Sequence, residues 1–144
     1  METVKLYRPV GLKELELIRL SGWKQFPPRL EWQPIFYPVL NETYASQIAR
    51  DWNTKDAFSG HCGIVTVFEL SREHFLRYPV QVVGGDVHQE LWVPAEELAE
   101  FNSHIVGGIR VANAYFGEEF VMPENEEMVE VLVKFKNNGN ESTK

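Results

Sequence analysis

His88, Glu90 and Trp92 recur at every second position of a strand-like segment, and they carry side chains from which a reactive site can be built. Alternate side chains of a strand lie on the same face, so these three share one face while Leu91 and Val93 share the other. If Leu91 and Val93 face the core, the opposite face is a wall with one carboxylate. Such a carboxylate can stabilise positive charge that develops on a substrate. The pattern also fits an exposed strand face with ordinary polar groups, and both interpretations are open.

Arg8 stands out in the first strand-like segment, residues 3–9, because alternation places it on the same face as Val4 and Leu6. A guanidinium that is buried without a partner loses its hydration at a high cost in free energy. Arg8 is therefore expected either to form an ion pair at the margin of a sheet or to hold an anion.

Aromatic residues cluster where a predicted strand, residues 35–40, passes into a predicted helix. Phe36 is expected in the core. The rings of Tyr37 and Tyr44 each have a polar tip, which suits the wall of a binding site, and we expect them to stack on a flat ligand.

Cys62 is the only cysteine, which is typical of proteins from a reducing cytosol. A thiol nucleophile would need a histidine close to it in space, and His74, His88 and His104 are the candidates. The alternative is a buried, inert thiol. The histidines and the cysteine have no recognised metal-ligand spacing, so no metal site is expected.

The segments that must position these side chains mix strand and helix patterns. Residues 64–70 are apolar on both faces, which is typical of a central strand. Asn41 and Ser71 are each well placed to cap a helix, and Gly22 suits the end of one. The sequence predicts an α+β fold with a mostly antiparallel, split sheet of about six or seven strands and about three short helices. The predicted strands are residues 3–9, 35–40, 64–70, 79–83, 88–93, 103–116 and 128–136.

The chain has 144 residues, of which 44% are hydrophobic, and this is enough for one domain with a substantial core. We expect a single domain over residues 1–136 and a flexible polar tail over residues 137–144. The formal net charge is −7 and the 14 basic residues are scattered, which disfavours nucleic acid as a main partner. No apolar run approaches the roughly 18 residues of a membrane span, so a cytoplasmic protein is expected.

Three segments, "LYRPV", "IFYPVLNETYASQIA" and "QELWVPAEEL", together resemble the ADP-ribosyltransferase fold of bacterial toxins and poly-ADP-ribose polymerases. In that family a first strand carries Arg or His. A second strand then leads into a helix, and a late strand opens with the catalytic Glu. The resemblance covers roughly residues 4–112 and rests on the order and spacing of the segments.

The resemblance implies a role for each residue that matches the family pattern. Arg8 would hold a phosphate or ribose of NAD, and Glu90 would be the catalytic residue that stabilises an oxocarbenium-like centre as nicotinamide leaves. Tyr37 or Tyr44 would stack on nicotinamide. His88 stands where many members carry the Glu or Gln that helps to choose the acceptor, and we expect it to contact the substrate, as does Trp92 on the same face.

The function that follows is an NAD-dependent mono-ADP-ribosyltransferase or NAD glycohydrolase, with NAD as a substrate and no metal. Its acceptor would be a protein or a small molecule, and a neutralising partner protein is an open question. The chain has "FYPVL" where arginine-specific members carry Ser-Thr-Ser. The alternative is therefore a non-catalytic relative that binds a nucleotide or a partner protein through the aromatic loop 23–37, with Trp23, Phe26 and Trp32 in contact. A Cys62-dependent hydrolase is the third hypothesis.

Overall fold

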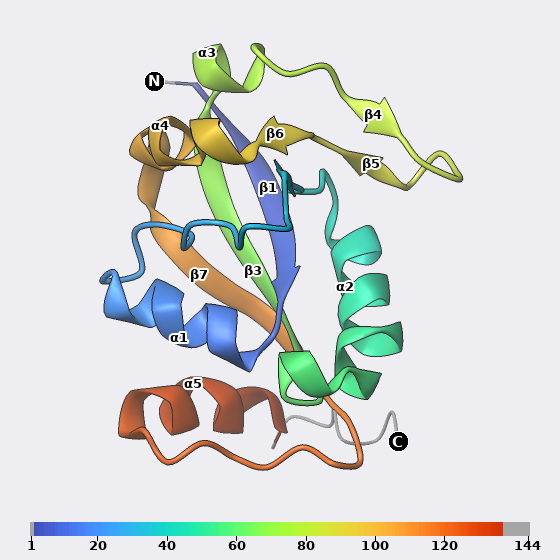
Figure 1. Ribbon diagram of the computed structural model, residues 1–144, viewed down its shortest axis with the longest axis vertical. Coiled ribbons are helices and arrows are strands. Elements are labelled where there is room, and N and C mark those ends of the chain that lie inside the picture. Colours follow the sequence, from blue (N-terminus) through green and yellow to red (C-terminus); the bar gives the residue numbers. More distant parts are fainter. Residues whose placement is uncertain (1, 137–144) are drawn as a thin grey trace.

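A three-stranded antiparallel sheet with the order β1-β3-β7 lies at the centre of the fold (Figure 1). The structure is a computed structural model that describes residues 2–136. β3 is paired on both edges and buried along nearly its whole length, because a helix packs on one face and the main core on the other, and this confirms the prediction of a central strand. The strands of this sheet are β1 (Thr3–Val10), β3 (Cys62–Ser71) and β7 (Ile105–Phe116).

Four two-residue strands lie beside the central sheet and form two small antiparallel pairs. Val39 connects one of these pairs to β1, because it bridges to Tyr7 on one side and to Glu90 on the other. Since neighbouring strands are about 4.8 Å apart, Glu90 lies roughly 10 Å from β1. The pairs are β2 (Ile35–Phe36) with β6 (Val93–Pro94), and β4 (Gln81–Val82) with β5 (Gln89–Glu90).

Helix α2 (Glu42–Asp51) begins where the sequence predicts, because the side chain of Asn41 accepts a hydrogen bond of 2.7 Å from the Tyr44 amide. The same asparagine donates to the Val87 carbonyl at 2.6 Å, so the cap also ties α2 to the hairpin that carries Glu90. The helix packs on β1 and β3 through small side chains. Gly63 allows this approach, since a Cβ there would overlap the backbone of Ala49.

The main core lies beneath the other face of the central sheet and contains a cluster of phenylalanines. Phe26 packs against Phe36 and Phe68 with ring centroids 5.1 Å and 5.0 Å apart, and Phe101 completes the group. Phe36 is in the core as predicted. The prediction that Phe26 contacts a partner is wrong, because its side chain is 1% exposed.

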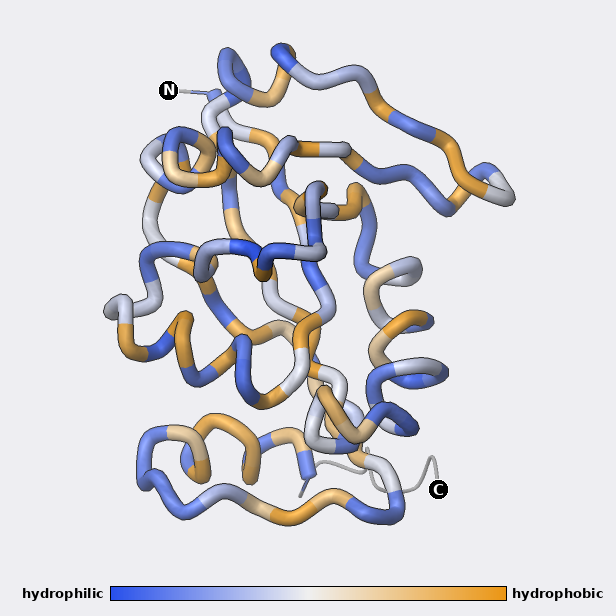
Figure 2. Tube along the Cα trace, in the orientation of Figure 1, coloured by the Kyte–Doolittle hydropathy of each residue, from blue (hydrophilic) through white to orange (hydrophobic). Residues whose placement is uncertain are grey.

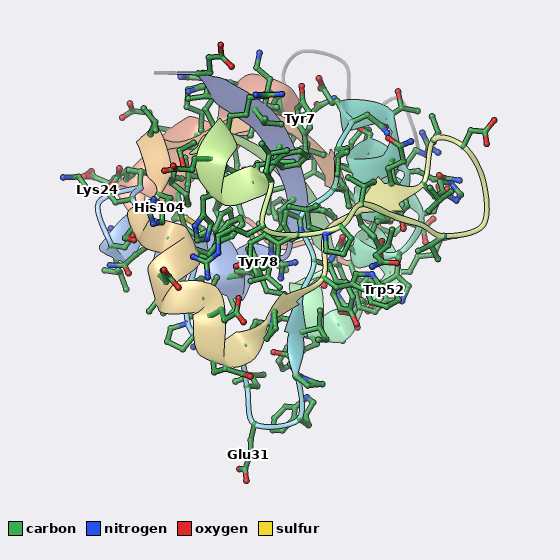
Figure 3. The ribbon with its side chains drawn as sticks, turned by 90° about the horizontal axis from the view of Figure 1, so that it is seen from above. Tyr7, Lys24, Glu31, Trp52, Tyr78 and His104 are labelled. Atoms are coloured by element: carbon green, nitrogen blue, oxygen red, sulfur yellow. The ribbon has the colours of Figure 1, made fainter. Side chains whose placement is uncertain are left out.

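Five α-helices occur within residues 2–136, compared with about three in the prediction. Ser71 caps α3 as expected, and Gly22 follows α1 with a φ of 80°. Figure 2 shows that apolar residues also occur on the protruding β4–β5 hairpin, and Figure 3 shows Glu31 projecting from the loop after α1. The remaining helices are α1 (Leu12–Leu20), α3 (Arg72–Phe75), α4 (Leu98–Ser103) and α5 (Glu126–Lys136), with 3-10 turns η1 (Asn53–Lys55), η2 (Ala57–Ser59) and η3 (Ala95–Glu97).

The strand predicted at residues 128–136 is wrong, because this segment belongs to helix α5. Met128, Leu132 and Phe135 recur at a helical spacing of four and three, and the first two are buried against the core. Glu127 near the start of α5 also accepts a hydrogen bond of 2.8 Å from the Trp23 indole.

The other predicted strands are confirmed in position, but 35–40, 79–83 and 88–93 contain only two-residue strands. The predicted tail, residues 137–144, lies outside the described residues. Within residues 2–136, no helix is long and apolar enough to cross a membrane.

Candidate functional site

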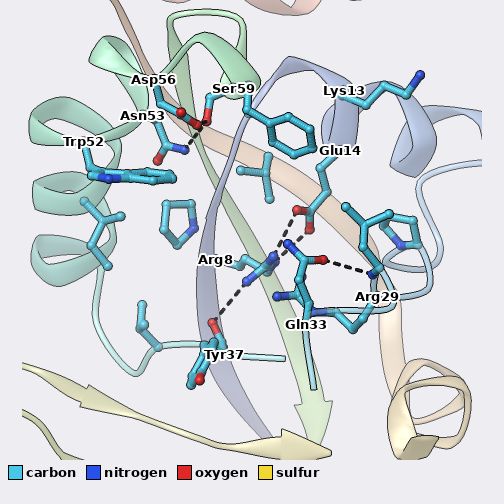
Figure 4. A pocket seen from close by; sticks show the side chains of 18 of the residues that line it. Arg8, Lys13, Glu14, Arg29, Gln33, Tyr37, Trp52, Asn53, Asp56 and Ser59 are labelled. Atoms are coloured by element: carbon cyan, nitrogen blue, oxygen red, sulfur yellow. Dashed lines mark hydrogen bonds and ion pairs between the residues drawn. The ribbon is translucent and has the colours of Figure 1, made fainter. Parts of the chain in front are cut away.

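A cleft of about 980 Å³ opens between α1 with the following loop on one side and the end of α2 on the other (Figure 4). This volume matches the pockets that hold small organic ligands. Four of the six residues singled out in the sequence line it, namely Arg8, Tyr37, Glu90 and Trp92. The other two, Tyr44 and His88, lie behind Glu90 and contact it directly or through one another.

Glu90 is held in a fixed position by hydrogen bonds to both of its carboxylate oxygens. Oε2 accepts from the Tyr44 hydroxyl at 2.8 Å, and Oε1 accepts from the Trp92 indole at 2.8 Å. The residue is 9% exposed, while Leu91 and Val93 are fully buried in the core. The predicted alternation is therefore confirmed, and Glu90 belongs to a wall that is ordered in advance of any ligand.

The ring of Tyr44 stacks on His88 with centroids 4.5 Å apart, and His88 contacts the Gln47 side chain at 3.0 Å and the Val83 carbonyl at 3.1 Å. Burial raises the pKa of Tyr44 to about 12, and the hydrogen bond to Glu90 adds to this effect. The phenol therefore stays protonated at neutral pH and keeps donating to the carboxylate. Tyr44 lies outside the cleft, so the structure places it as a support for Glu90.

Arg8 forms an ion pair with Glu14, which is one of the two expectations from the sequence. Its Nε and Nη2 donate to the two Glu14 oxygens at 2.7 Å and 2.9 Å, and its guanidinium lies 4.7 Å from the centre of the Phe36 ring. Nη1 also donates to the Tyr37 carbonyl at 3.4 Å. Since a guanidinium has five N–H groups, two remain for a ligand in the cleft.

Arg29 is a second guanidinium on the cleft, and sequence reasoning missed it. Its Nε donates to the Ile35 carbonyl at 3.1 Å and its guanidinium lies 5.9 Å from the Phe36 ring centre. Among the ion pairs of residues 2–136, none involves Arg29. Burial lowers the pKa of Arg29, and the charge of Arg8 adds to this effect. A cation without a carboxylate partner beside Arg8 is suited to hold an anion.

Exposed aromatic side chains surround the opening of the cleft. Tyr37 is 40% exposed and Trp92 is 45% exposed near Glu90, while Trp52 and Phe58 are 60% and 71% exposed at the end of α2. Exposed rings around a concave site are typical of surfaces that bind flat ligands.

The structure bears on two alternative hypotheses from the sequence. Cys62 is fully buried, and burial raises the pKa of its thiol to about 12, so the Cys62-dependent hydrolase is contradicted. In the loop proposed to bind a partner, Trp32 is exposed, whereas Phe26 is in the core and the Trp23 indole is bonded to Glu127.

His74, Glu100 and His104 place possible metal-ligand atoms within 4.8 Å of one another, although their sequence spacing gave no signal. Contacts within the protein account for this group. Glu100 pairs with Arg77 at 3.0 Å, and the two imidazoles stack face to face with centroids 4.2 Å apart. We therefore interpret the group as packing between α3 and α4.

Comparisons of the chain with protein-family models, with curated proteins and with solved structures gave no match. The functional interpretation therefore depends on the residues of the cleft and on the resemblance in the order of its sequence segments.

Proposed function

We propose that the protein binds NAD in the cleft and cleaves its nicotinamide–ribose bond, acting as a mono-ADP-ribosyltransferase or an NAD glycohydrolase. The observation that carries this proposal is Glu90, a buried carboxylate on the cleft wall whose two oxygens are held by Tyr44 and Trp92. An antiparallel α+β fold with α2 packed beside the first strand also agrees with the ADP-ribosyltransferase-like fold that the sequence suggests.

Glu90 would act on the ribose that carries nicotinamide. As the bond from C1′ to the nicotinamide nitrogen breaks, its electron pair leaves with neutral nicotinamide, and positive charge develops on C1′ and the ring oxygen. A carboxylate already in place stabilises this charge without reorganisation. Water or a nucleophile of the acceptor then bonds to C1′ and releases its proton to the surrounding water.

The rest of the cleft offers groups for the rest of the dinucleotide. Arg29 and the two unused N–H groups of Arg8 can bind the diphosphate, since guanidinium groups match the geometry of phosphate oxygens. Tyr37 and Trp92 lie near Glu90 and can stack on nicotinamide. The acceptor in this proposal is water, a small molecule or a protein, because the net charge of −7 disfavours a nucleic acid.

The proposal is tested by calorimetry with NAD together with an assay for released nicotinamide. Glu90→Gln keeps an oxygen for the Trp92 indole and offers an amide to the Tyr44 hydroxyl, so this variant can fold. We expect it to bind NAD and to release nicotinamide about 10²- to 10³-fold more slowly than the wild type. Arg29→Gln is expected to weaken NAD binding, whereas Arg72→Gln, an exposed arginine on α3, serves as the matched control.

Two outcomes would change the interpretation. If the wild type does not bind millimolar NAD, the transferase proposal fails. If the wild type binds NAD but neither it nor Glu90→Gln releases nicotinamide with any acceptor supplied, the protein is a non-catalytic nucleotide-binding relative that uses the same cleft.

A further inference from the structure

Asn53 lies at the end of the cleft beside α2, and its amide orientation is fixed by its neighbours (Figure 4). The Ser59 hydroxyl donates its proton to Asp56 at 2.6 Å. Ser59 can then only accept from Asn53, and the Asn53 Nδ2 does donate to it at 2.9 Å. The side-chain carbonyl Oδ1 of Asn53 therefore points away from this chain of hydrogen bonds.

Oδ1 of Asn53 has no hydrogen-bond partner, although the residue is only 5% exposed. Only one other buried polar side-chain atom within residues 2–136 is in this state, the Nε of Arg19. Buried polar groups in folded proteins are nearly always paired, so an unpaired acceptor on a residue that lines the cleft is suited to accept a hydrogen bond from a ligand.

An exposed aromatic ring lies beside this acceptor, because Trp52 directly precedes Asn53 in the chain. Phe58, on the turn η2, is exposed and lines the same cleft. Figure 4 shows the Trp52 ring beside Asn53, and no hydrogen bond among the described residues holds its indole. Exposed rings change rotamer rapidly, so Trp52 can turn to uncover Oδ1 and to stack on a flat ligand.

The position of this subsite along the cleft fits one end of a dinucleotide. The cap of α2 at Asn41 is tied to the hairpin of Glu90, and the ten residues of the helix span about 15 Å to Trp52. In Figure 4 Arg8 lies between Tyr37 at one end and Trp52 with Asn53 at the other. The order along the cleft is thus a carboxylate, cations and a site for a flat ring.

We propose that Trp52, Asn53 and Phe58 form a subsite for an aminopurine ring, with Oδ1 of Asn53 accepting a hydrogen bond from its exocyclic amino group. This inference rests on the proposed function in assigning the ring to the adenine of NAD. At this point Asn53 presents only the acceptor Oδ1. A purine with an oxo group in place of the amino group would therefore place the lone pairs of its oxygen against those of Oδ1.

The test is calorimetry with NAD and with its hypoxanthine analogue, in which an oxo group replaces the 6-amino group of adenine. The wild type is expected to bind NAD about 10-fold or more tightly than the analogue, because NAD supplies a donor to Oδ1 of Asn53 whereas the analogue places an oxo oxygen against it. In Asn53→Ala the two ligands are expected to bind equally. Trp52→Ala changes an exposed side chain, so it is expected to fold and to weaken both ligands alike.

The outcomes separate this inference from the proposed function. Equal binding of the two ligands to the wild type overturns the aminopurine subsite and leaves NAD cleavage by Glu90 intact. Selective binding of NAD without release of nicotinamide keeps the subsite and removes the transferase activity. If neither ligand binds, both proposals are overturned.

Discussion

The hydroxyl of Tyr44 donates a hydrogen bond of 2.8 Å to Glu90, which is 46 residues away in the sequence. Helix α2 and the β5 strand are thereby joined at the carboxylate on which the proposed chemistry depends. Tyr44→Phe removes this hydroxyl. Oε2 of the mostly buried Glu90 then loses its hydrogen-bond donor. We expect unfolding to require about 1–3 kcal/mol less free energy, measured by urea denaturation, and nicotinamide release to slow by about 10-fold or more. Tyr37→Phe is the control for stability, because its side chain is 40% exposed and only its backbone carbonyl bonds to Arg8.

The ion pair of Arg8 and Glu14 is mostly shielded from water, with side chains 10% and 21% exposed. Arg8→Ala leaves Glu14 without its partner, and we expect a loss of about 3 kcal/mol in the free energy of unfolding. The double variant with Glu14→Ala should recover part of this loss, since no unpaired charge remains. A double-mutant cycle by urea denaturation measures the coupling, and the exposed pair of Arg50 and Asp51 is the control, with no measurable effect expected. Equal losses in the single and double variants would contradict this account.

Burial raises the pKa of the Cys62 thiol to about 12, from the value of 9.0 expected for an exposed thiol. Native protein should therefore resist iodoacetamide at pH 8, and labelling should become stoichiometric in denaturant. The thiolate forms more readily in the unfolded chain, so this group stabilises the fold below pH 9 and that contribution is lost as the pH rises from about 9 to about 12. Mass spectrometry after timed labelling checks the first statement, and rapid labelling of the native protein would refute it.

Burial lowers the pKa of His74, and the neighbouring His104 and Arg77 act in the same direction. The unfolded chain then binds a proton more readily than the folded protein, so stability contributed by neutral His74 is present above about pH 6.5 and is lost as the pH falls below it. Urea denaturation at pH 7.5 and pH 5 should show this loss in the wild type. His74→Phe keeps a ring in the same packing and should show a smaller loss, and an equal loss would assign the effect to other groups.

Gly63 lies where the backbone of α2 approaches β3, and a Cβ there would overlap the Ala49 carbonyl. Gly63→Ala must push α2 away from the sheet, so we expect a loss of about 2 kcal/mol or more in the free energy of unfolding. Gly85→Ala is the matched control, since its nearest contact is a His88 atom at 3.8 Å and its backbone needs no special conformation. Thermal denaturation of the two variants measures the difference.

The parts of the fold that were predicted from the sequence depend on neighbouring residues. The cap at Asn41, the cap at Ser71 and the buried strand 64–70 each follow from local patterns, and so does the alternation around Glu90. The helix at Glu126–Lys136 was missed because its valines alternate as in a strand while its buried residues follow a helical spacing.

The parts of the site that were missed depend on residues far apart in the sequence. Nothing near Arg29 indicates that its loop folds back over the Phe36 ring and lines the same cleft as Arg8. The role of Asn53 as an unpaired acceptor also needs the positions of Ser59 and Asp56, which only the folded turn brings together. Burial of Phe26 in the core likewise depends on Phe68, 42 positions later in the chain.

The bridge through Val39 has a consequence for local stability. Two backbone hydrogen bonds of 2.9 Å and 2.7 Å join Val39 to Tyr7, and within residues 2–136 the backbone pairing of the Glu90 strand with the central sheet runs through Val39 and its neighbours. Breaking so few bonds costs far less than unfolding β3, which is paired on both edges. In native-state hydrogen exchange, the amides of Val39 and Leu91 should therefore open together and before those of β3. The carboxylate would then belong to a separate cooperative unit, and a ligand that spans the cleft would slow exchange in both units at once.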